Sequence, residues 1–329
     1  MGNKFRLSLF GESHGTALGI VADGIPAGLP LSKEDFTADL ERRKWGEYPE
    51  LRRGTTPRKE ADEPIILSGV LNGRTTSAPI AIIFENKCQR SKDYDNLRVA
   101  PRPGHADFVA QKKFNGFNDI RGGGHFSGRL TLNLIAAGVI AKKILSATLG
   151  EKVRISAKIT EIGGCAHQSE WDTIINGAIE EKDSVGGIVE CTATGLPVGL
   201  GEPFFDSLES KIAHLAFSIP GVKGIEFGAG FACTKMKGSE FNDLIINADG
   251  TTSTNNSGGI NGGISNGNPI VFRLAIRPTA SIAKEQNTIN LRSGKVEPLQ
   301  ITGRHDACIA LRCPVIAEAV TAIALADCL

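Results

Sequence analysis

The sequence has almost no excess of one charge, because its 37 lysines and arginines stand against 36 aspartates and glutamates. A balanced chain lacks the overall field that attracts a protein to a nucleic acid or to an anionic membrane surface. We therefore expect neither nucleic acid nor membrane among its partners. Any anionic ligand has to be held by a local group of cations.

Long hydrophobic runs and metal-binding motifs are also missing. The longest uncharged apolar stretch, residues 130–141, is far shorter than the about 20 residues that span a bilayer, and the N-terminus lacks a secretion-signal pattern. The seven cysteines are an odd number, with no C-x-x-C pair and no zinc-ligand spacing, and no H-E-x-x-H motif occurs. We predict reduced thiols, no metal site, and a soluble, cytoplasmic protein.

At 329 residues and 41% hydrophobic content, the chain can bury a large core. Neither an internal repeat nor a Pro/Ser-rich linker divides it, so we expect one integrated α+β domain over residues 1–329. Ser32 with Asp35, and Asp206 with Glu209, have capping-box spacing and predict two amphipathic helices. Residues 130–149 and 314–328 are apolar on nearly every side, which is typical of core helices.

Candidate strands lie at residues 6–10, 65–70, 80–84, 188–193 and 270–276. In the last of these, four large apolar residues alternate with other side chains at a period of two: Ile270, Phe272, Leu274 and Ile276. This pattern favours an antiparallel sheet with one apolar face.

One local group of cations places six basic residues within eighteen: Arg42, Arg43, Arg52, Arg53, Arg58 and Lys59. Guanidinium groups bind carboxylate and phosphate in bidentate fashion, so the cluster suits a small polyanion. The alternative is a solvated helix end followed by an ordinary loop.

A glycine-rich segment, Arg-Gly-Gly-Gly-His-Phe-Ser-Gly-Arg at residues 121–129, precedes the first core helix. Glycines allow backbone N–H groups to approach an anion, and a helix N-terminus adds a partial positive charge. Arg129 and Leu130 stand where a P-loop needs Lys and Ser/Thr, which excludes a nucleoside triphosphatase. We predict an anion or cofactor-phosphate site, the alternative being a tight turn without a ligand.

Three of the six histidines, His14, His105 and His305, lie in short, glycine-flanked polar motifs. Imidazole exchanges protons near neutral pH, which makes loop histidines natural general acids. Taken alone, a histidine of this kind is more often a structural hydrogen-bonding residue than a catalyst. His167 and His214 have no such setting and are interpreted as structural.

Longer motifs carry more specific information. Phe-Gly-Glu-Ser-His-Gly begins at residue 10, Thr-Pro-Arg-Lys-Glu-Ala-Asp at 56, Arg-Pro-Gly-His-Ala-Asp at 102, and Ser-Gly-Gly-Ile-Asn-Gly-Gly-Ile-Ser at 257. Asn-Lys-Cys-Gln-Arg-Ser-Lys-Asp-Tyr at 86, Arg-Pro-Thr at 277 and Gly-Arg-His-Asp at 303 complete the series. Taken in chain order, the motifs resemble the chorismate synthase family over nearly the whole chain.

The resemblance implies a β-α-β sandwich in which long core helices lie between two antiparallel four-stranded sheets, assembled as a homotetramer. It also implies the reaction, a 1,4-anti elimination of phosphate from 5-enolpyruvylshikimate 3-phosphate that gives chorismate. Reduced FMN is required although the net reaction is not a redox change, and NADPH is the candidate reductant.

Site residues follow from the resemblance motif by motif. His14 is expected to protonate the departing phosphate, His105 to protonate the reduced flavin, and Asp306 to act near flavin N5. Arg43, Arg53 and Arg129 are the expected substrate-binding arginines. The residues expected to bind FMN are Ser13, His125, Phe126, Ser127, Ser253, Thr254, Gly262, Arg277, Pro278, Thr279, Ala280, Ser281 and Arg304.

The chain departs from the family pattern at several positions. His125 replaces the common arginine after the triple glycine, Asn256 replaces a histidine, and Ala307 replaces a proline. Two alternatives remain: an NADPH-oxidising flavin reductase, disfavoured by the absence of a Gly-x-Gly-x-x-Gly motif after a strand, and a non-catalytic anion-binding scaffold.

Overall fold

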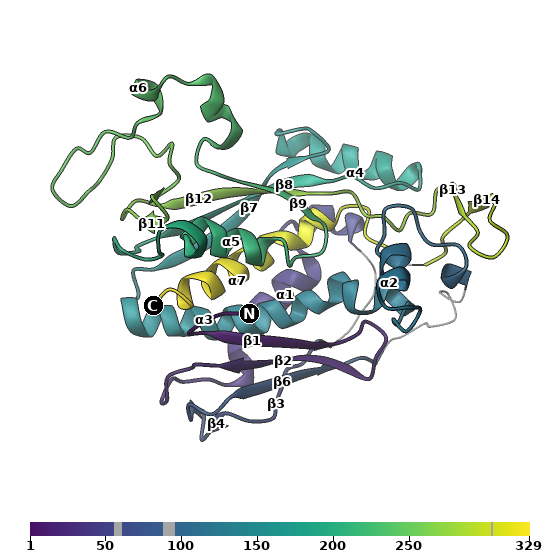
Figure 1. Ribbon diagram of the computed structural model, residues 1–329, viewed down its shortest axis with the longest axis horizontal. Helices are drawn as coiled ribbons and strands as arrows, with labels where there is room; N and C mark the ends of the chain where they lie inside the picture. Colours follow the sequence, from purple (N-terminus) through teal and green to yellow (C-terminus); the bar gives the residue numbers. More distant parts are fainter. Residues whose placement is uncertain (56–60, 88–95, 304) are drawn as a thin grey trace.

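The computed structural model describes residues 1–55, 61–87, 96–303 and 305–329. Its elements form three layers, a sheet below, a layer of helices, and a second sheet above (Figure 1). This confirms the predicted α+β sandwich with core helices between two four-stranded sheets.

The lower sheet has the strand order β1-β2-β6-β3, with every neighbouring pair antiparallel. Its strands are β1 (Arg6–Gly11), β2 (Ala17–Asp23), β3 (Ile65–Ile66) and β6 (Ile80–Glu85). Leu18 and Ile20 of β2 and Ile80, Ile82 and Phe84 of β6 are fully buried. Their period of two places these side chains on the face that packs against the helices.

The upper sheet has the order β7-β8-β12-β9 and is also antiparallel. It consists of β7 (Arg154–Ile162), β8 (Gly187–Thr194), β9 (Val222–Phe227) and β12 (Ile270–Ile276). The alternation expected for β12 is confirmed, since Ile270, Phe272, Leu274 and Ile276 are all buried.

Four helices lie between the sheets (Figure 1): α1 (Thr37–Trp45), α3 (Thr131–Leu149), α5 (Leu208–Ala216) and α7 (Cys313–Ala326). Helices α3 and α7 pack so closely that a Cβ atom on Gly138 would lie 2.4 Å from the Cβ atom of Ala319. Two segments that include these helices are long and apolar enough to span a membrane, but 78% and 89% of them is buried inside the protein. Their apolar composition is therefore explained by packing between the two sheets.

Shorter elements lie outside the two four-stranded sheets. Three two-stranded hairpins are β4 (Val70–Leu71) with β5 (Arg74–Thr75), β10 (Ile260–Asn261) with β11 (Ile264–Ser265), and β13 (Gln286–Ile289) with β14 (Val296–Leu299). In the described residues, the other α-helices are α2 (Asp107–Lys113), α4 (Trp171–Glu180) and α6 (Gly238–Phe241), and short 3-10 helices connect several elements.

Two local predictions were wrong in detail. Residues 65–70 do not form one strand, because Gly69 adopts a left-handed φ of 81° and separates β3 from β4. Helix α5 is capped by Ser207 rather than Asp206, since the Ser207 hydroxyl accepts a hydrogen bond from the Ser210 backbone N–H at 3.1 Å. The capping box at Ser32 is confirmed, and it begins a 3-10 turn that leads into α1.

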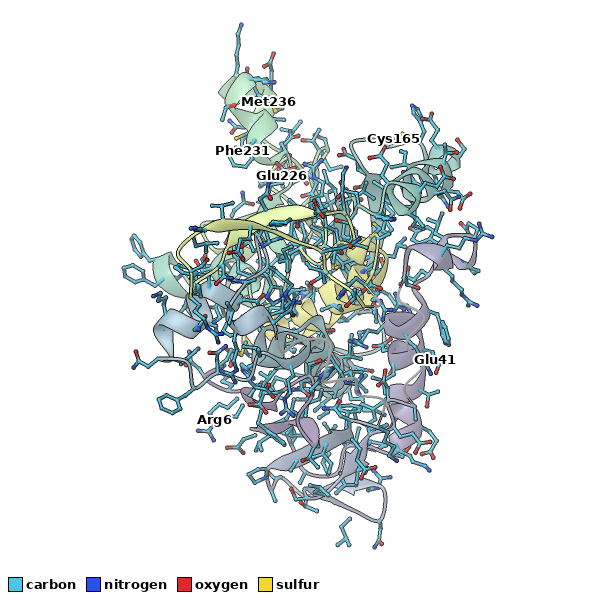
Figure 2. All side chains as sticks on the ribbon, turned by 90° about the vertical axis from the view of Figure 1, so that its right-hand side faces the viewer. Arg6, Glu41, Cys165, Glu226, Phe231 and Met236 are labelled. Atoms are coloured by element: carbon cyan, nitrogen blue, oxygen red, sulfur yellow. The ribbon has the colours of Figure 1, made fainter. Side chains whose placement is uncertain are left out.

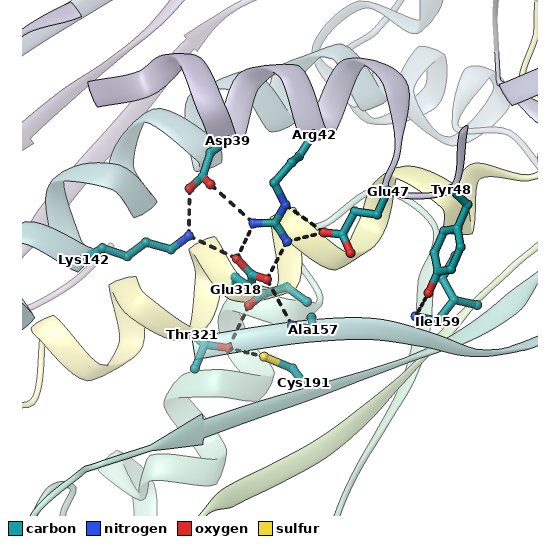
Figure 3. A network of polar contacts seen from close by, with 11 residues as sticks. Asp39, Arg42, Glu47, Tyr48, Lys142, Ala157, Ile159, Cys191, Glu318 and Thr321 are labelled. Carbon is teal, nitrogen blue, oxygen red and sulfur yellow. Dashed lines mark hydrogen bonds and ion pairs between the residues drawn. The ribbon is translucent and has the colours of Figure 1, made fainter. Parts of the chain in front are cut away.

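A buried ionic network fastens the helix layer to the upper sheet (Figure 3). Glu318 of α7, whose side chain is 4% exposed, receives two hydrogen bonds from the Arg42 guanidinium at 2.7 and 2.8 Å. Lys142 of α3 donates to the same carboxylate at 3.1 Å, and so does the backbone N–H of Ala157 in β7 at 3.0 Å. One carboxylate thus joins three helices and a strand.

Candidate functional site

A cavity of about 580 Å³ opens where the N-termini of α3 and α7 meet. Its walls come from residues 102–106, 122–131, 217–221, 277–281 and 305–316, together with Ser13, Arg43, Lys44 and Asp62. The volume lies within the about 300–1,000 Å³ of typical small-molecule sites. Segments that are distant in sequence therefore form one candidate active site.

The cavity is electropositive. Among its described lining residues, the cations are Arg43, Lys44, Arg102, Arg129, Arg277 and Arg312, whereas the carboxylates are only Asp62 and Asp306. Both adjoining helices begin at the cavity, and each N-terminus contributes about half a positive charge. A chain with balanced overall charge thus concentrates positive potential at one place.

The three consecutive glycines bring the backbone against two histidines. A Cβ atom on Gly122 would lie 2.8 Å from both His14 Nε2 and Ser13 Oγ, and one on Gly123 would lie 3.3 Å from His105 Nε2. All three glycines have positive φ, which other residues adopt rarely. Glycine is therefore needed at these positions to leave room for His14 and His105. His105 lines the cavity, whereas His14 lies behind the glycine loop and is not a lining residue.

We expect Gly122→Ala to lower turnover about tenfold or more, because the new methyl group must displace His14 or Ser13 and because alanine is strained at a φ of 61°. Steady-state kinetics together with circular dichroism will measure this. Gly177→Ala on α4 is the matched control, since its Cβ would meet nothing within 4 Å. Unchanged turnover in Gly122→Ala would show that the close contact is unimportant.

His105 is held by its own segment. Its Nδ1 lies 2.7 Å from Asp107 Oδ1, and Arg102 donates from Nε to the other oxygen of Asp107 at 2.7 Å. Arg102 also donates to Ser281 Oγ at 2.9 Å, which fastens this segment to the chain after β12. His105 Nε2 faces the glycine loop, 3.3 Å from where a Gly123 Cβ would stand.

Two buried arginines that line the cavity share one carboxylate. Arg129 Nη1 donates to Asp62 Oδ1 at 3.0 Å, and Arg43 Nη1 lies 3.7 Å from Asp62 Oδ2. Arg43 Nε donates to Thr131 Oγ1 at 2.8 Å, and Arg129 Nε donates to Asn86 Oδ1 at 2.6 Å. Burial lowers the pKa of the Arg43 guanidinium from its usual value, with the Asp62 charge opposing this effect.

Asp306 also lines the cavity, in the segment that precedes α7. Its Oδ1 pairs with Arg312 Nη2 at 3.2 Å. Beside it, burial lowers the pKa of His305, so this imidazole is neutral at neutral pH. Within the described part of the chain, Thr279 Oγ1, His305 Nε2 and Arg312 Nε are buried atoms without a hydrogen-bond partner. They are available to a polar ligand.

Most residues predicted to bind the cofactor line this cavity: Ser13, His125, Phe126, Ser127, Arg277, Pro278, Thr279, Ala280 and Ser281. Phe126 is partly exposed, with its ring 6.5 Å from that of Phe114. His125 also lines a smaller cavity of about 280 Å³, whose walls include five leucines and His214. His125 Nδ1 lies 2.8 Å from the Gly11 carbonyl oxygen.

Several predicted residues lie elsewhere. Arg53 is exposed and does not line the cavity, and Gly262 lies in the turn between β10 and β11. Ser253 and Thr254 belong to a loop before that hairpin, where Thr254 Oγ1 donates to Asp243 at 2.7 Å. Ser253, Thr254 and Gly262 come before β12 in the chain, whereas the cavity-lining residue Arg277 comes directly after it. Arg304 lies outside the described residues, so its assignment stays a prediction.

The basic cluster does not form one surface. Arg42 faces Glu318 in the helix layer, while Arg43, the next residue of α1, reaches the cavity. Neighbouring helical residues point about 100° apart, which separates their targets. Arg52 stacks over the half-buried Trp45 ring, 5.5 Å from its centroid, and Arg58 and Lys59 lie outside the described residues.

Other lining residues were missed by the motif analysis, notably Asp62, Arg102, Pro220, Gly221 and Arg312. Asp62 and Arg102 are the ends of two quoted motifs, so a charged residue at a motif boundary was the available signal. Gly221, with a φ of 99°, and Pro220 form a turn that no motif marked.

Sequence comparison identifies relatives of the whole chain. The family model described as chorismate synthase matches residues 5–329. The chorismate synthase of Chitinophaga pinensis is 61% identical over 326 residues, which cover 99% of this chain and 95% of that protein. The chorismate synthase of Methanocella arvoryzae is 47% identical over 349 aligned positions, which cover 99% of this chain and 92% of that protein.

Structural comparison agrees. A solved structure described as a crystal structure of chorismate synthase aligns with a TM-score of 0.75 at 26% sequence identity, covering 100% of this chain and 92% of the other. The match of fold, motifs and full length leaves one conclusion: the chain belongs to the chorismate synthase family.

Proposed function

We propose that the cavity at the N-termini of α3 and α7 is where this lyase converts 5-enolpyruvylshikimate 3-phosphate into chorismate, the last step of the shikimate pathway. The observation that carries this proposal is the set of six lining cations against two carboxylates. The substrate has two carboxylates and one phosphate, and each charge-assisted hydrogen bond to an arginine contributes about 1.5–3 kcal/mol.

The residues present also fit FMN as the cofactor. The glycine backbone of residues 122–124, the partly exposed Phe126 ring and the unpartnered Thr279 hydroxyl offer anion, stacking and hydrogen-bonding contacts in one cavity. Ser127, Arg277 and Ser281 would complete the cradle. When bound, reduced FMN supplies electron density that stabilises cationic or radical character in the substrate ring.

The protein side chains then divide the proton chemistry. We propose that His14 donates a proton to the phosphate that leaves C3, with Ser13 orienting His14 beside the glycine loop. His105 presents its Nε2 proton to the cavity, and Asp306, held by Arg312, receives the proton derived from C6. Arg43 and Arg129 hold the anionic groups of the substrate. NADPH is the proposed source of electrons for the flavin.

A homotetramer is the proposed assembly, and exposed apolar side chains support it. Residues 228–258, here termed the arm, project from the upper sheet and carry the exposed Phe231, Leu244 and Ile245 (Figures 1 and 2). Phe204 and Phe205 are 86% and 94% exposed. A neighbouring subunit would cover these groups, and it could place Ser253 and Thr254 of the arm beside the cavity of another chain.

We expect the double variant Phe231→Asp with Ile245→Asp to dissociate the oligomer, because two charges would have to be buried in the interface. Light scattering after size-exclusion chromatography measures the mass, and FMN titration follows the cofactor site. Val296→Asp in β14, equally exposed, is the control. A variant that keeps the wild-type mass would contradict the placement of the interface on the arm.

Two further properties belong to the same proposal. Residues 1–329 form one domain, supported by one continuous hydrophobic core that includes Leu18 of the lower sheet, Ile140 of α3 and Phe272 of the upper sheet. The protein works in the cytoplasm, supported by the six described cysteines, all of which are free thiols.

The decisive experiment is anaerobic. Purified protein is mixed with 5-enolpyruvylshikimate 3-phosphate and chemically reduced FMN, and chorismate absorbance is followed together with released phosphate. We expect equal amounts of both products, and a repeat with NADPH and oxidised FMN tests intrinsic flavin reduction. Flavin binding without product would favour the reductase or the scaffold. Undiminished product formation by variants that lack cavity cations such as Arg43 and Arg129 would refute the proposed location.

A further inference from the structure

Asp107 occupies a special position behind His105. Its side chain is 3% exposed and lies 2.7 Å from His105 Nδ1, while three Arg102 nitrogens, the backbone N–H, Nε and Nη2, donate to its two oxygens at 2.7–3.1 Å. The carboxylate therefore has a fixed orientation. Burial raises its pKa, but the hydrogen bonds from Arg102 and His105 outweigh this, so the pKa of Asp107 lies well below its usual value.

These distances decide which ring nitrogen of His105 is protonated. An unprotonated Nδ1 would place two acceptors, Nδ1 and Asp107 Oδ1, 2.7 Å apart with no hydrogen between them. The contact from Arg102 Nη2 to Nδ1 is longer, 3.1 Å, and the same nitrogen has a better acceptor in Asp107 Oδ1 at 2.8 Å. Nδ1 is therefore the donor to Asp107, which leaves Nε2 for the cavity.

We propose that Asp107 is a positioning residue for His105, which fixes the ring with Nδ1–H toward the carboxylate and stabilises the imidazolium that can donate a proton from Nε2. Arg102 limits this stabilisation, because its charge offsets most of the carboxylate charge. The inference rests on the proposed role of His105 in proton transfer. Asp107 does not line the cavity, so it acts through His105 and keeps its own charge.

Other charged groups also face His105 and have to be considered. From the chain after β12, Arg277 Nη1 donates to the Gly104 carbonyl oxygen at 2.6 Å. From the segment before α7 come Asp306 and His305, and the latter is neutral at neutral pH because burial lowers its pKa. Among the described residues, Arg102 and Asp107 are the charged groups in direct contact with His105, so substitutions there should dominate the effect on His105.

The test uses the pH dependence of turnover by the full-length enzyme with chemically reduced FMN between about pH 6 and 9. Activity should fall on the alkaline side as the proton donor loses its proton. Asp107→Asn removes the negative charge, so we expect this alkaline limb to move about one pH unit lower and kcat to fall about tenfold. Arg102→Leu removes the opposing charge and should move the limb in the opposite direction.

Asp327→Asn is the matched control. Asp327 is equally buried, accepts several backbone hydrogen bonds and pairs with Lys211 at 2.9 Å, but lies at the C-terminal end of α7. It should lose stability without a change in the pH profile. An Asp107→Asn profile that coincides with wild type, while His105→Ala is inactive, overturns the inference; a fully active His105→Ala refutes the proposed role of His105 itself.

Wild-type protein labelled with ¹⁵N-histidine gives a second readout that needs no variant. Ring nitrogen shifts at alkaline pH should show His105 as the Nδ1–H tautomer, assigned by comparison with His105→Gln. An Nε2–H tautomer would overturn the inference even if the Asp107 and Arg102 variants failed to fold.

Discussion

His14→Ala and His105→Ala each lower kcat by about 100-fold or more, while the fold and the affinity for substrate change little. Positioned general acids contribute factors of about 10²–10⁴. Both imidazoles lie against the same glycine loop, His14 at Gly122 and His105 at Gly123. His105 also lines the electropositive cavity. Stopped-flow detection of chorismate under anaerobic conditions measures the effect.

The matched control for both variants is His167→Ala, since His167 lies on the surface before α4 and does not line the cavity. Wild-type turnover in either active-site variant would remove that residue from the proton chemistry. Partial recovery of His14→Ala, but not of His167→Ala, by added imidazole would support proton donation by His14. A loss of stability equal to the loss of turnover would indicate a structural role instead.

Glu318→Ala reduces the free energy of unfolding by about 3 kcal/mol, because removing the central carboxylate leaves Arg42 and Lys142 with fewer anionic partners in a partly desolvated network. Arg42 would lose its two hydrogen bonds to Glu318, and Lys142 would lose one of its two carboxylate partners (Figure 3). The Ala157 N–H would lose its acceptor. Urea titration followed by circular dichroism measures the change. The control, Lys158→Ala, breaks the exposed pair with Glu190 and should cost less than about 1 kcal/mol.

The same network gives stability a defined pH dependence. Burial raises the pKa of Glu318, but hydrogen bonds from Arg42 and the nearby Lys142 outweigh it, and the folded pKa lies below the usual value. A lowered carboxyl pKa contributes stability that is fully present above the unfolded pKa and is lost as the pH falls through the folded pKa. Glu318→Ala should therefore lose less stability on acidification than wild type, and parallel pH curves would contradict this assignment.

Hydrophobic patterns in the sequence predicted one central strand and the two long core helices. The alternation of residues 270–276 and the all-round apolarity of residues 130–149 and 314–328 correspond to β12, α3 and α7 within two residues. Strands β2, β7 and β9 were not predicted. Gly19 in β2 shows one reason, because a Cβ there would lie 2.3 Å from the Ile82 carbonyl oxygen, a constraint set by the neighbouring strand.

The motifs, read in chain order, determined the family and its reaction and predicted His14 and His105 as proton donors, because these inferences depend on residue types at fixed spacing. Only the tertiary structure decided that Arg42 stabilises the helix layer while Arg43 faces the cavity, and that Arg102 reaches Ser281 across 179 residues of sequence. It also decided that α3 and α7 both begin at the cavity. Such pairings arise from long-range packing of the two sheets on the helices, for which a local pattern contains no information.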